Sequence, residues 1–483
     1  MPSLQDNTIN SMLWCTVDKF GMLSLAFVSN LILARLLMPE VFGCIAILHV
    51  FLAVADIIVH GGFASAIIQR KDPTHLDYTS AFFCNLAISV TLYVILFLCA
   101  PLIAVFYNLP ILCTVLRVQS LELIINSFSV VQLGILKRNL QFKALAFRDL
   151  IGSFVGLAAG VVCAICGLDV WSLVVNVLVS RFIGTILLWK ASSWRPTFEF
   201  SVQSVKSLFG FGGVLMVTSI LSTIYDNLQS LIIGKFFSAT ETGYVNQAKK
   251  LETVPAGALS SVVTQVSFPV FSKIQDDKNR LRIGLRKNVK SIQYVNLPMM
   301  VLLIIIAKPL LLLCYGERWL MCVPYFQILC VGQLISVVNP INSSVVMATG
   351  KAKSHLFAQI IKCVVAIILI SISVKRGVVA LLWALTIIPY IEFLVYSLIN
   401  KKIIGYGVFA QLYDMLPAAL VTAIVSITTF YIGKIIPWHP YLVMLVQCLF
   451  FIGVYIGITG VLNFDGFKVY YNVVNEKLLK KHK

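Results

Sequence analysis

Residues 80–106 read SAFFCNLAISVTLYVILFLCAPLIAVF, a run of 27 residues without a single charged side chain. A helix needs about 20 apolar residues to cross the hydrocarbon core of a bilayer. This run exceeds that length and is bounded on its N-terminal side by charged residues and a proline. It therefore predicts a membrane-spanning helix.

The rest of the chain has the same character. Of its 483 residues, 59% are hydrophobic and only 12% are charged, and the mean hydropathy is +0.92. An ordinary soluble domain carries about 25% charged residues. Because so little polar chain remains between the apolar runs, the composition leaves no room for a large external catalytic domain. We therefore expect a membrane protein that is not an enzyme.

Thirteen further apolar runs accompany the first, each bounded by charges, proline or glycine. The fourteen runs lie at about 10–34, 41–62, 80–106, 110–134, 146–166, 170–189, 208–234, 243–271, 291–315, 319–347, 354–374, 377–400, 413–433 and 440–462. They predict an all-α polytopic membrane protein with about 14 transmembrane helices. A polar connector after the sixth run divides the chain. We expect an N-terminal six-helix bundle at 1–190, a C-terminal six-helix bundle at 207–400, two additional helices at 411–463 and a basic tail at 464–483.

The net charge of +18 comes from basic residues that lie between the apolar runs rather than on one amphipathic face. We interpret them as topology signals and expect no nucleic-acid partner. The segment 273–290 shows the bias best, with Lys273, Lys278, Arg280, Arg282, Arg286, Lys287 and Lys290. By the positive-inside rule, this segment and both termini are expected in the cytoplasm.

Two segments of the chain resemble each other. Leu-Ala-Arg-Leu-Leu-Met-Pro-Glu-Val-Phe-Gly at 33–43 ends the first expected helix and opens the second. Ile-Gly-Lys-Phe-Phe-Ser-Ala-Thr-Glu-Thr-Gly at 233–243 does the same for the seventh and eighth. Duplicated halves are a recurring transporter architecture, so the repeat indicates a transporter.

Several sequence blocks, taken together, resemble the MOP flippase superfamily, and specifically the Wzx-type lipopolysaccharide and exopolysaccharide exporters of its polysaccharide transporter family. The blocks are 33–43, GFASAIIQRK at 62–71, TGYVNQA at 242–248, FPVFSKIQDD at 268–277 and YGERW at 315–319. Their order and spacing match the family from the first helix to about residue 350. The resemblance implies two six-helix bundles that face each other across a central cavity, with two extra helices at the C-terminus.

The resemblance also implies a function. A Wzx-type flippase moves an undecaprenyl-diphosphate-linked oligosaccharide, the repeat unit of an O-antigen, capsule or exopolysaccharide, from the cytoplasmic to the periplasmic leaflet of the bacterial inner membrane by alternating access. The expected partners are this lipid-linked substrate, membrane lipid, a polysaccharide polymerase and glycosyltransferases. The sequence contains no motif for ATP, a metal or another cofactor, so we expect an ion gradient to drive transport.

Charged residues inside the expected spans are the candidate site residues, because a charge in hydrocarbon is costly and usually faces a cavity or a partner. The cationic candidates for the diphosphate are Arg181, Lys250, Arg117 and Lys19. The candidates for ion coupling are Asp56 and Asp226, which lie on polar stripes of their helices. Other intramembrane charges are Asp18, Glu122, Lys249, Glu252, Lys362 and Glu392.

Each candidate has a structural alternative. In this interpretation Arg117 and Glu122 form a pair within their bundle, and Lys249 and Glu252 form an ion pair one turn apart. Lys19 and Lys362 would extend their charged ends towards the membrane interface. The twelve cysteines are scattered, and the closest two, Cys163 and Cys166, are interpreted as small apolar residues rather than as a redox pair.

Two other functions remain open. One is cation-coupled export of small organic cations, the drug-efflux activity of the same superfamily, against which a cationic cavity argues. The other is a non-transporting membrane scaffold for polysaccharide assembly, in which the intramembrane charges would be structural pairs.

Overall fold

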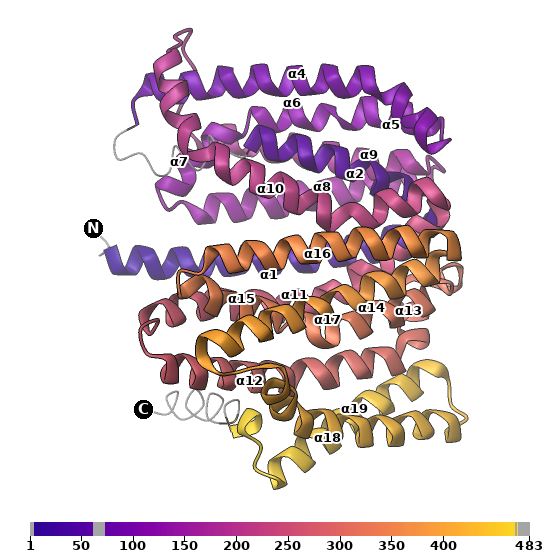
Figure 1. The fold of residues 1–483 in the computed structure, drawn as a ribbon. Helices are drawn as coiled ribbons and strands as arrows, with labels where there is room; N and C mark the ends of the chain where they lie inside the picture. The colour runs from indigo at the N-terminus through magenta and orange to yellow at the C-terminus, as the bar shows by residue number, and fades with distance from the viewer. Residues whose placement is uncertain (1–3, 61–72, 469–470, 472–483) are drawn as a thin grey trace. The chain divides into compact units, whose positions relative to one another are not determined.

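The computed structural model describes residues 4–60, 73–468 and 471, in which the regular elements are all helices (Figure 1). The chain divides into two compact units, Met1–Asn246 and Gln247–Lys483. The block at 62–71 and the end of the basic tail lie outside the described residues.

The first unit contains nine helices in its described residues, followed by the start of a tenth. They are α1 (Leu4–Leu36), α2 (Pro39–His60), α4 (His75–Tyr107), α5 (Ile111–Gln119), α6 (Leu121–Ser127), α7 (Val130–Arg138), α8 (Phe142–Ile165), α9 (Val170–Ala191), α10 (Val202–Phe236) and the beginning of α11 (Ala239–Lys273). Within this unit α1 packs on α8, while α10 packs on α2 and α4.

The second unit continues α11 and adds the remaining helices of the described chain. They are α12 (Lys278–Ile305), α13 (Ala307–Tyr315), the short 3-10 helix η1 (Glu317–Trp319), α14 (Cys322–Ser336), α15 (Asn339–Ala348), α16 (Ala352–Ser373), η2 (Val374–Arg376), α17 (Val378–Ile404), α18 (Val408–Ile435) and α19 (Pro440–Val461). The closest neighbours here are α12 with α18, α14 with α17, and α16 with α17.

Among the described residues, eleven helices are long and apolar enough to cross a membrane, or twelve when a bent pair counts as one span. The all-helical, polytopic class that the hydropathy predicts is therefore confirmed. The other two expected spans coincide with α10 and α11, which are helices of 35 residues each.

The expected run at 110–134 is not a straight helix. It is divided into α5, α6 and α7, and the two parts of the span meet at an angle of 41°. Small polar residues, among them Ser120, Ser127 and Ser129, lie at the breaks, where their side chains compete with the helical backbone for hydrogen bonds. A sum of hydropathies over this run does not detect such a break.

The basic segment at 273–290 is mostly helical rather than a loop. α12 begins at Lys278, where the Asp277 side chain accepts hydrogen bonds of 3.0 Å from the backbone N–H groups of Asn279 and Arg280. This N-cap satisfies donors that the first helical turn leaves free. The basic residues therefore form the first turns of α12, because charge bias predicts the side of the membrane but not the local backbone.

Three glycines one turn apart let α8 approach α9 closely. A Cβ atom at Gly152 would lie 2.9 Å from the carbonyl oxygen of Ser180, and one at Gly156 would lie 2.5 Å from that of Asn176. Gly160 continues the stripe against Ser172. Spacing of small residues by four is a common way for membrane helices to pack backbone against backbone.

The two repeated segments of the sequence meet in the structure. A side chain at Gly43, on α2, would overlap the backbone carbonyl of Ala239, and one at Gly243, on α11, would overlap that of Pro39. The four residues are related in pairs by 200 positions, so the contact is reciprocal. This supports the prediction that 33–43 and 233–243 are equivalent parts of a duplicated unit.

The core of the second unit contains polar side chains, whereas many apolar ones are exposed. Asn342 exchanges side-chain hydrogen bonds of 3.0 and 3.1 Å with Gln411, and Asn400 donates to Asn342 at 3.0 Å. On α19, Leu449 is 65% exposed and Ile456 is 48% exposed. This distribution is typical of helices surrounded by lipid, where amides are satisfied only inside the protein.

Candidate functional site

Arg181, on α9, lies within a network of charged side chains in the first unit. It interacts electrostatically with Glu122 on α6 and with Arg148 and Asp149 on α8. Because hydrocarbon does not solvate a guanidinium group, nearby carboxylates are needed to stabilise it inside a span. Glu122 and Asp149 therefore compensate part of the Arg181 charge when no ligand is bound.

Asp56, on α2, joins the same network through α6. The side-chain amide of Asn126 donates a hydrogen bond of 2.9 Å to Asp56 Oδ1, and Asn126 is only 2% exposed. Asp56 also acts electrostatically on Glu122. Glu122 and Asn126 are four residues apart, so they lie on the same face of the short helix α6. The Glu122 carboxylate on this helix thus interacts with both Asp56 and Arg181.

Arg148 and Asp149 form the second half of the network, with 3.0 Å between Arg148 Nη1 and Asp149 Oδ1. The Arg148 side chain is only 12% exposed and passes over Gly184 of α9, where a Cβ atom would lie 3.1 Å from Arg148 Nε. Asp18 on α1 and Lys137 on α7 act electrostatically on this pair. The glycine therefore provides the space in which a buried arginine crosses between α8 and α9.

The network is close to electrical balance. Its members come from α1, α2, α6, α7, α8 and α9 and comprise three cations and four carboxylates, namely Lys137, Arg148, Arg181, Asp18, Asp56, Glu122 and Asp149. An anionic ligand at Arg181 would therefore have to compete with Glu122 and Asp149. Neutralising one of these carboxylates would strengthen the attraction of the network for an anion.

Of the six predicted site residues, the structure brings Arg181 and Asp56 into this network and places the other four elsewhere. Arg117 Nε donates to the carbonyl oxygen of Phe97 at 3.3 Å, and its guanidinium carbon lies 4.3 Å from the centre of the Phe97 ring. Lys19 is exposed on α1, and Asp226 is exposed on α10. Lys250 is exposed on α11 in the second unit. The roles of all six remain predictions.

Two other pairs of intramembrane charges interact within the second unit. Lys362 on α16 and Glu392 on α17 form an ion pair of 3.2 Å. Lys249 acts electrostatically on Glu252, which is 2% exposed and also interacts with the side chain of Gln333 on α14. In these pairs each charge is compensated by its neighbour, as expected for contacts that hold helices together.

Asp414, on α18, organises a further cluster at the start of α12. Its carboxylate accepts two hydrogen bonds of 2.7 Å from Arg286 and one of 2.9 Å from the Tyr406 hydroxyl. Burial, together with the neighbouring Asp414 charge, raises the pKa of Tyr406, so this hydroxyl keeps its proton and donates. Lys290 approaches Asp414 to 3.5 Å and pairs with Asp465 at 2.8 Å, which lowers the pKa of Asp465.

Asn126, Asp149 and Asp414 were not candidates from the sequence. Asn126 follows Glu122 by one helical turn, which is a weak signal in an isolated run. Arg148 and Asp149 stand at the beginning of an apolar run and therefore resemble a boundary. Within the described residues no three His, Cys, Asp or Glu side chains are placed to hold a metal ion, and the twelve cysteines are free.

Comparisons with known proteins agree with this helical architecture. A family model described as "Polysaccharide biosynthesis protein" matches residues 32–324. The lipopolysaccharide biosynthesis protein WzxC of Escherichia coli is 30% identical over 354 residues, which are 71% of this chain and 70% of that protein. The succinoglycan biosynthesis transport protein ExoT of Rhizobium meliloti is 25% identical over 88% of this chain and 87% of its own length.

Solved structures share the fold at low sequence identity. A lipid II flippase, MurJ, in an inward closed conformation superposes with a TM-score of 0.75 at 16% identity, covering 93% of this chain and 98% of that one. An inward-facing multidrug resistance transporter of the MATE family, described as part of the MOP superfamily, superposes with a TM-score of 0.62 at 15% identity, covering 82% of this chain and 98% of that one.

Proposed function

Since the chain belongs to the polysaccharide biosynthesis protein family, the Wzx-type exporters of the MOP superfamily, we propose that it flips an undecaprenyl-diphosphate-linked oligosaccharide from the cytoplasmic to the periplasmic leaflet. As a member of this family it is a multi-pass membrane transporter of polysaccharide biosynthesis and not an enzyme. The observation that carries the proposal is the 30% identity to WzxC over most of both chains.

The physical demands of this substrate support the proposal. The sugar head is too polar to enter hydrocarbon, and the diphosphate needs cations in a water-accessible site. The polyprenyl tail can remain in the bilayer throughout. A transporter that opens to one side and then to the other meets these demands, and repeated halves are the usual way to build one. The reciprocal contact of 33–43 with 233–243 supports such a duplicated design.

We propose that α10 and α11 also cross the membrane, which makes fourteen spans. In this arrangement two six-helix bundles, at 1–190 and 207–400, face a central cavity, and 411–463 supplies two additional helices. Both termini lie in the cytoplasm, and the membrane is the bacterial inner membrane. A polysaccharide polymerase and glycosyltransferases are the partners that this role requires.

Arg181 is the cation that we assign to the diphosphate, with Lys250, Arg117 and Lys19 as further candidates. Glu122 and Asp149 already compensate part of its charge, so the substrate and these carboxylates compete for one guanidinium. Uptake of a proton or cation by the carboxylate side of the network would release Arg181 for the diphosphate. This competition gives ion coupling a physical basis.

Among the alternatives, drug export is supported only by the fold shared with the MATE transporter, whereas the relatives reported above are named for polysaccharide synthesis. A scaffold role predicts that the protein alone moves no lipid. The test is a leaflet-resolved assay in vesicles that contain this protein as their only protein, with a fluorescent lipid-linked oligosaccharide and, separately, a fluorescent organic cation.

We expect transfer of the lipid-linked oligosaccharide, and no accumulation of the organic cation. Arg181→Gln should reduce transfer at least tenfold, Arg181→Lys should retain part of it because the charge is kept, and Arg376→Gln, at an exposed position in η2, should behave as wild type. Absence of transfer by folded wild-type protein would favour the scaffold, and accumulation of the cation would favour the drug exporter.

A further inference from the structure

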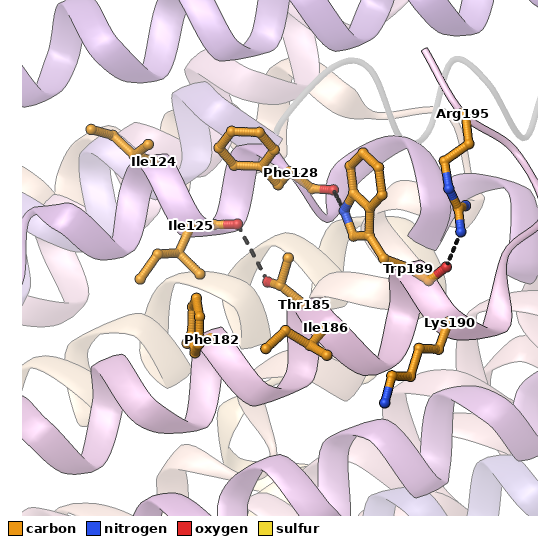
Figure 2. Close-up of a pocket in the computed structure, with 9 residues that line it drawn as sticks. All are labelled: Ile124, Ile125, Phe128, Phe182, Thr185, Ile186, Trp189, Lys190 and Arg195. Carbon is orange, nitrogen blue, oxygen red and sulfur yellow. Dashed lines mark hydrogen bonds between the residues drawn. The ribbon is translucent and has the colours of Figure 1, made fainter.

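A groove on the first unit combines an apolar lining with two cations at one end. It has a volume of about 460 Å³ and lies between α6, α9 and the connection that follows α9 (Figure 2). The residues that line it are Ile124, Ile125, Phe128, Phe182, Thr185, Ile186, Trp189, Lys190 and Arg195. Its volume is in the range of small-molecule sites, about 300–1,000 Å³.

The polar atoms beside the apolar part of the groove form hydrogen bonds within the protein. Trp189 Nε1 donates to the carbonyl oxygen of Phe128 at 2.9 Å, and Thr185 Oγ1 donates to that of Ile125 at 3.4 Å, so the polar atoms near the groove are satisfied by the helices themselves. Phe182 is 54% exposed and Ile186 is 37% exposed. An apolar surface with no free hydrogen-bonding groups accepts a hydrocarbon chain and rejects a sugar.

The cations lie at the other end of the groove. Figure 2 shows Lys190 and Arg195 near Trp189, while Ile124 and Phe182 lie at the opposite end. From Phe182 to Lys190 the helix rises by about 12 Å. This length accommodates a segment of an acyl chain along α9, with its head group beside the cations.

Arg195 is held in place by the protein backbone. Its guanidinium donates hydrogen bonds of 2.7, 2.7 and 2.9 Å to the carbonyl oxygens of Ser192, Trp194 and Trp189, and it lies 5.3 Å from the Trp189 ring. These contacts orient the group without neutralising it, because carbonyls carry no net charge. The guanidinium therefore keeps its full positive charge at the mouth of the groove.

The connection that carries Arg195 is itself fastened to the start of α4. His75 contacts the Arg195 carbonyl oxygen at 3.2 Å, and the backbone N–H of Ser201 donates to Ser80 Oγ at 2.9 Å. Trp194 packs against Phe82 with 5.9 Å between ring centres. The cationic end is thus a fixed feature of the fold.

Lys190 supplies the charge that is available to a ligand. It is exposed, and none of the ion pairs formed by the described residues includes it. In the proposed fourteen-span arrangement, α9 is the sixth span and the connection after it lies on the cytoplasmic side. A basic pocket between membrane helices on that side attracts anionic lipid head groups. Trp189 lies beside the two cations, as expected for an aromatic residue at the membrane interface.

We propose that this groove binds an anionic phospholipid of the cytoplasmic leaflet, with one acyl chain against Phe182 and Ile186 and the phosphate at Lys190 and Arg195. The negative charge of a phosphodiester complements the two cations, and an acyl chain complements the apolar lining along α9. Phospholipid is also the most abundant lipid in the leaflet, so mass action favours it. The groove shares α6 and α9 with the network around Arg181, but none of its lining residues is a charged member of that network, and its occupancy does not depend on which substrate is transported.

The test is native mass spectrometry of the purified full-length protein, titrated with phosphatidylglycerol or with phosphatidylcholine of the same acyl chains. We expect the wild type to retain one phosphatidylglycerol in preference to phosphatidylcholine. Lys190→Gln should weaken phosphatidylglycerol binding about fivefold. Lys190 is preferred to Arg195 for this change because Arg195 also holds the backbone of its connection.

Ile186→Trp tests the apolar part of the groove, because the larger side chain occupies the space of the acyl chain, and it should also abolish the selective binding. The matched controls are Lys353→Gln and Ile368→Trp, at exposed positions of α16, which should bind as wild type. Equal binding of both phospholipids, unchanged binding by Lys190→Gln, or an equal loss in Lys353→Gln would each overturn the proposal. Displacement of phosphatidylglycerol by an equimolar polyprenyl phosphate would assign the groove to the carrier lipid and overturn it as well.

Discussion

At the scale of single residues, Asp56 is the carboxylate whose surroundings best separate a coupling role from a structural one. It accepts a hydrogen bond from Asn126 at 2.9 Å and acts electrostatically on Glu122, which interacts with Arg181. An asparagine at this position can still accept the bond from Asn126, but it cannot carry a charge. The substitution therefore removes the negative charge and keeps the acceptor for the hydrogen bond from Asn126.

We predict that Asp56→Asn retains the fold but loses the response of transport to a pH gradient. The measurement is gradient-driven transfer of a lipid-linked oligosaccharide in vesicles, normalised to folded protein. Asp169→Asn is the control, because Asp169 is exposed in the connection between α8 and α9 and asparagine tolerates its positive φ of 41° equally well. Wild-type gradient dependence in Asp56→Asn would remove this carboxylate from the coupling mechanism.

Asp414 and Asp465 allow a second comparison at the residue scale. Both contact Lys290, but Asp414 is buried and Asp465 is exposed. Removing Asp414 leaves Arg286, Tyr406 and Lys290 without their common acceptor. Because Tyr406 is only 1% exposed, its hydroxyl would be left unsatisfied, which costs about 1–3 kcal/mol. The side chain of Asp465 is 67% exposed, and an exposed ion pair contributes less than about 1 kcal/mol.

We therefore predict that Asp414→Ala lowers the melting temperature of the purified protein clearly more than Asp465→Ala does. Tryptophan fluorescence during heating in detergent measures both variants under identical conditions. Equal shifts would mean that the contacts of Asp414 do not stabilise α18 against α12.

At the scale of elements, the glycine stripe on α8 sets the distance to α9 and therefore the geometry of the charged network. Gly152 and Gly156 allow the backbone of α9 to approach, and Gly184 on α9 in turn leaves room for Arg148. The electrostatic interaction of Arg181 with Asp149 depends on this spacing, because the two residues lie on helices whose separation the glycines determine.

We predict that Gly156→Leu separates α8 from α9, destabilises the first unit and lowers the yield of folded protein. The reason is steric, because even a Cβ atom would lie 2.5 Å from the carbonyl oxygen of Asn176. Gly457→Leu on α19 is the matched control, since nothing lies within 4 Å of a Cβ atom there. Size-exclusion chromatography after extraction in detergent compares the two variants, and an equal yield of folded protein would contradict this role of the stripe.

At the scale of the whole molecule, the distribution of basic residues predicts its orientation. The turns of α12 that begin at Lys278 carry a cluster of lysines and arginines, and such clusters remain on the cytoplasmic side during insertion. η2, between α16 and α17, belongs to the opposite side in the fourteen-span arrangement. In that arrangement the even number of spans predicts that both termini lie in the cytoplasm.

We predict that single cysteines at Asn279 and at Arg376, in a variant without the twelve native cysteines, react with a membrane-impermeant maleimide from opposite sides of the membrane. Both positions are exposed, so reactivity reports the side and not burial. In intact cells only Arg376→Cys should be labelled, and Asn279→Cys should react after the inner membrane is opened. Labelling of both in intact cells would rule out the fourteen-span arrangement.

The sequence by itself determined the class of the molecule and the approximate places of most of its long apolar helices. Hydropathy is a local property, so runs such as 80–106 and 440–462 correspond to α4 and α19. The relation of 33–43 to 233–243 was also visible, because a duplication leaves similar residues at a constant spacing. The same blocks indicated the Wzx-type family, which the match over residues 32–324 confirms.

Only the tertiary structure decided which charges meet. Arg181 and Asp56 were candidates among many, and only the folded chain shows that both interact with Glu122 on the short helix α6. Asp149 joins them because glycines bring α8 close to α9. Distances between helices follow from the packing of complete surfaces, whereas a single sequence describes each helix separately. For that reason the charged network and the groove beside Trp189 became visible only in the folded chain.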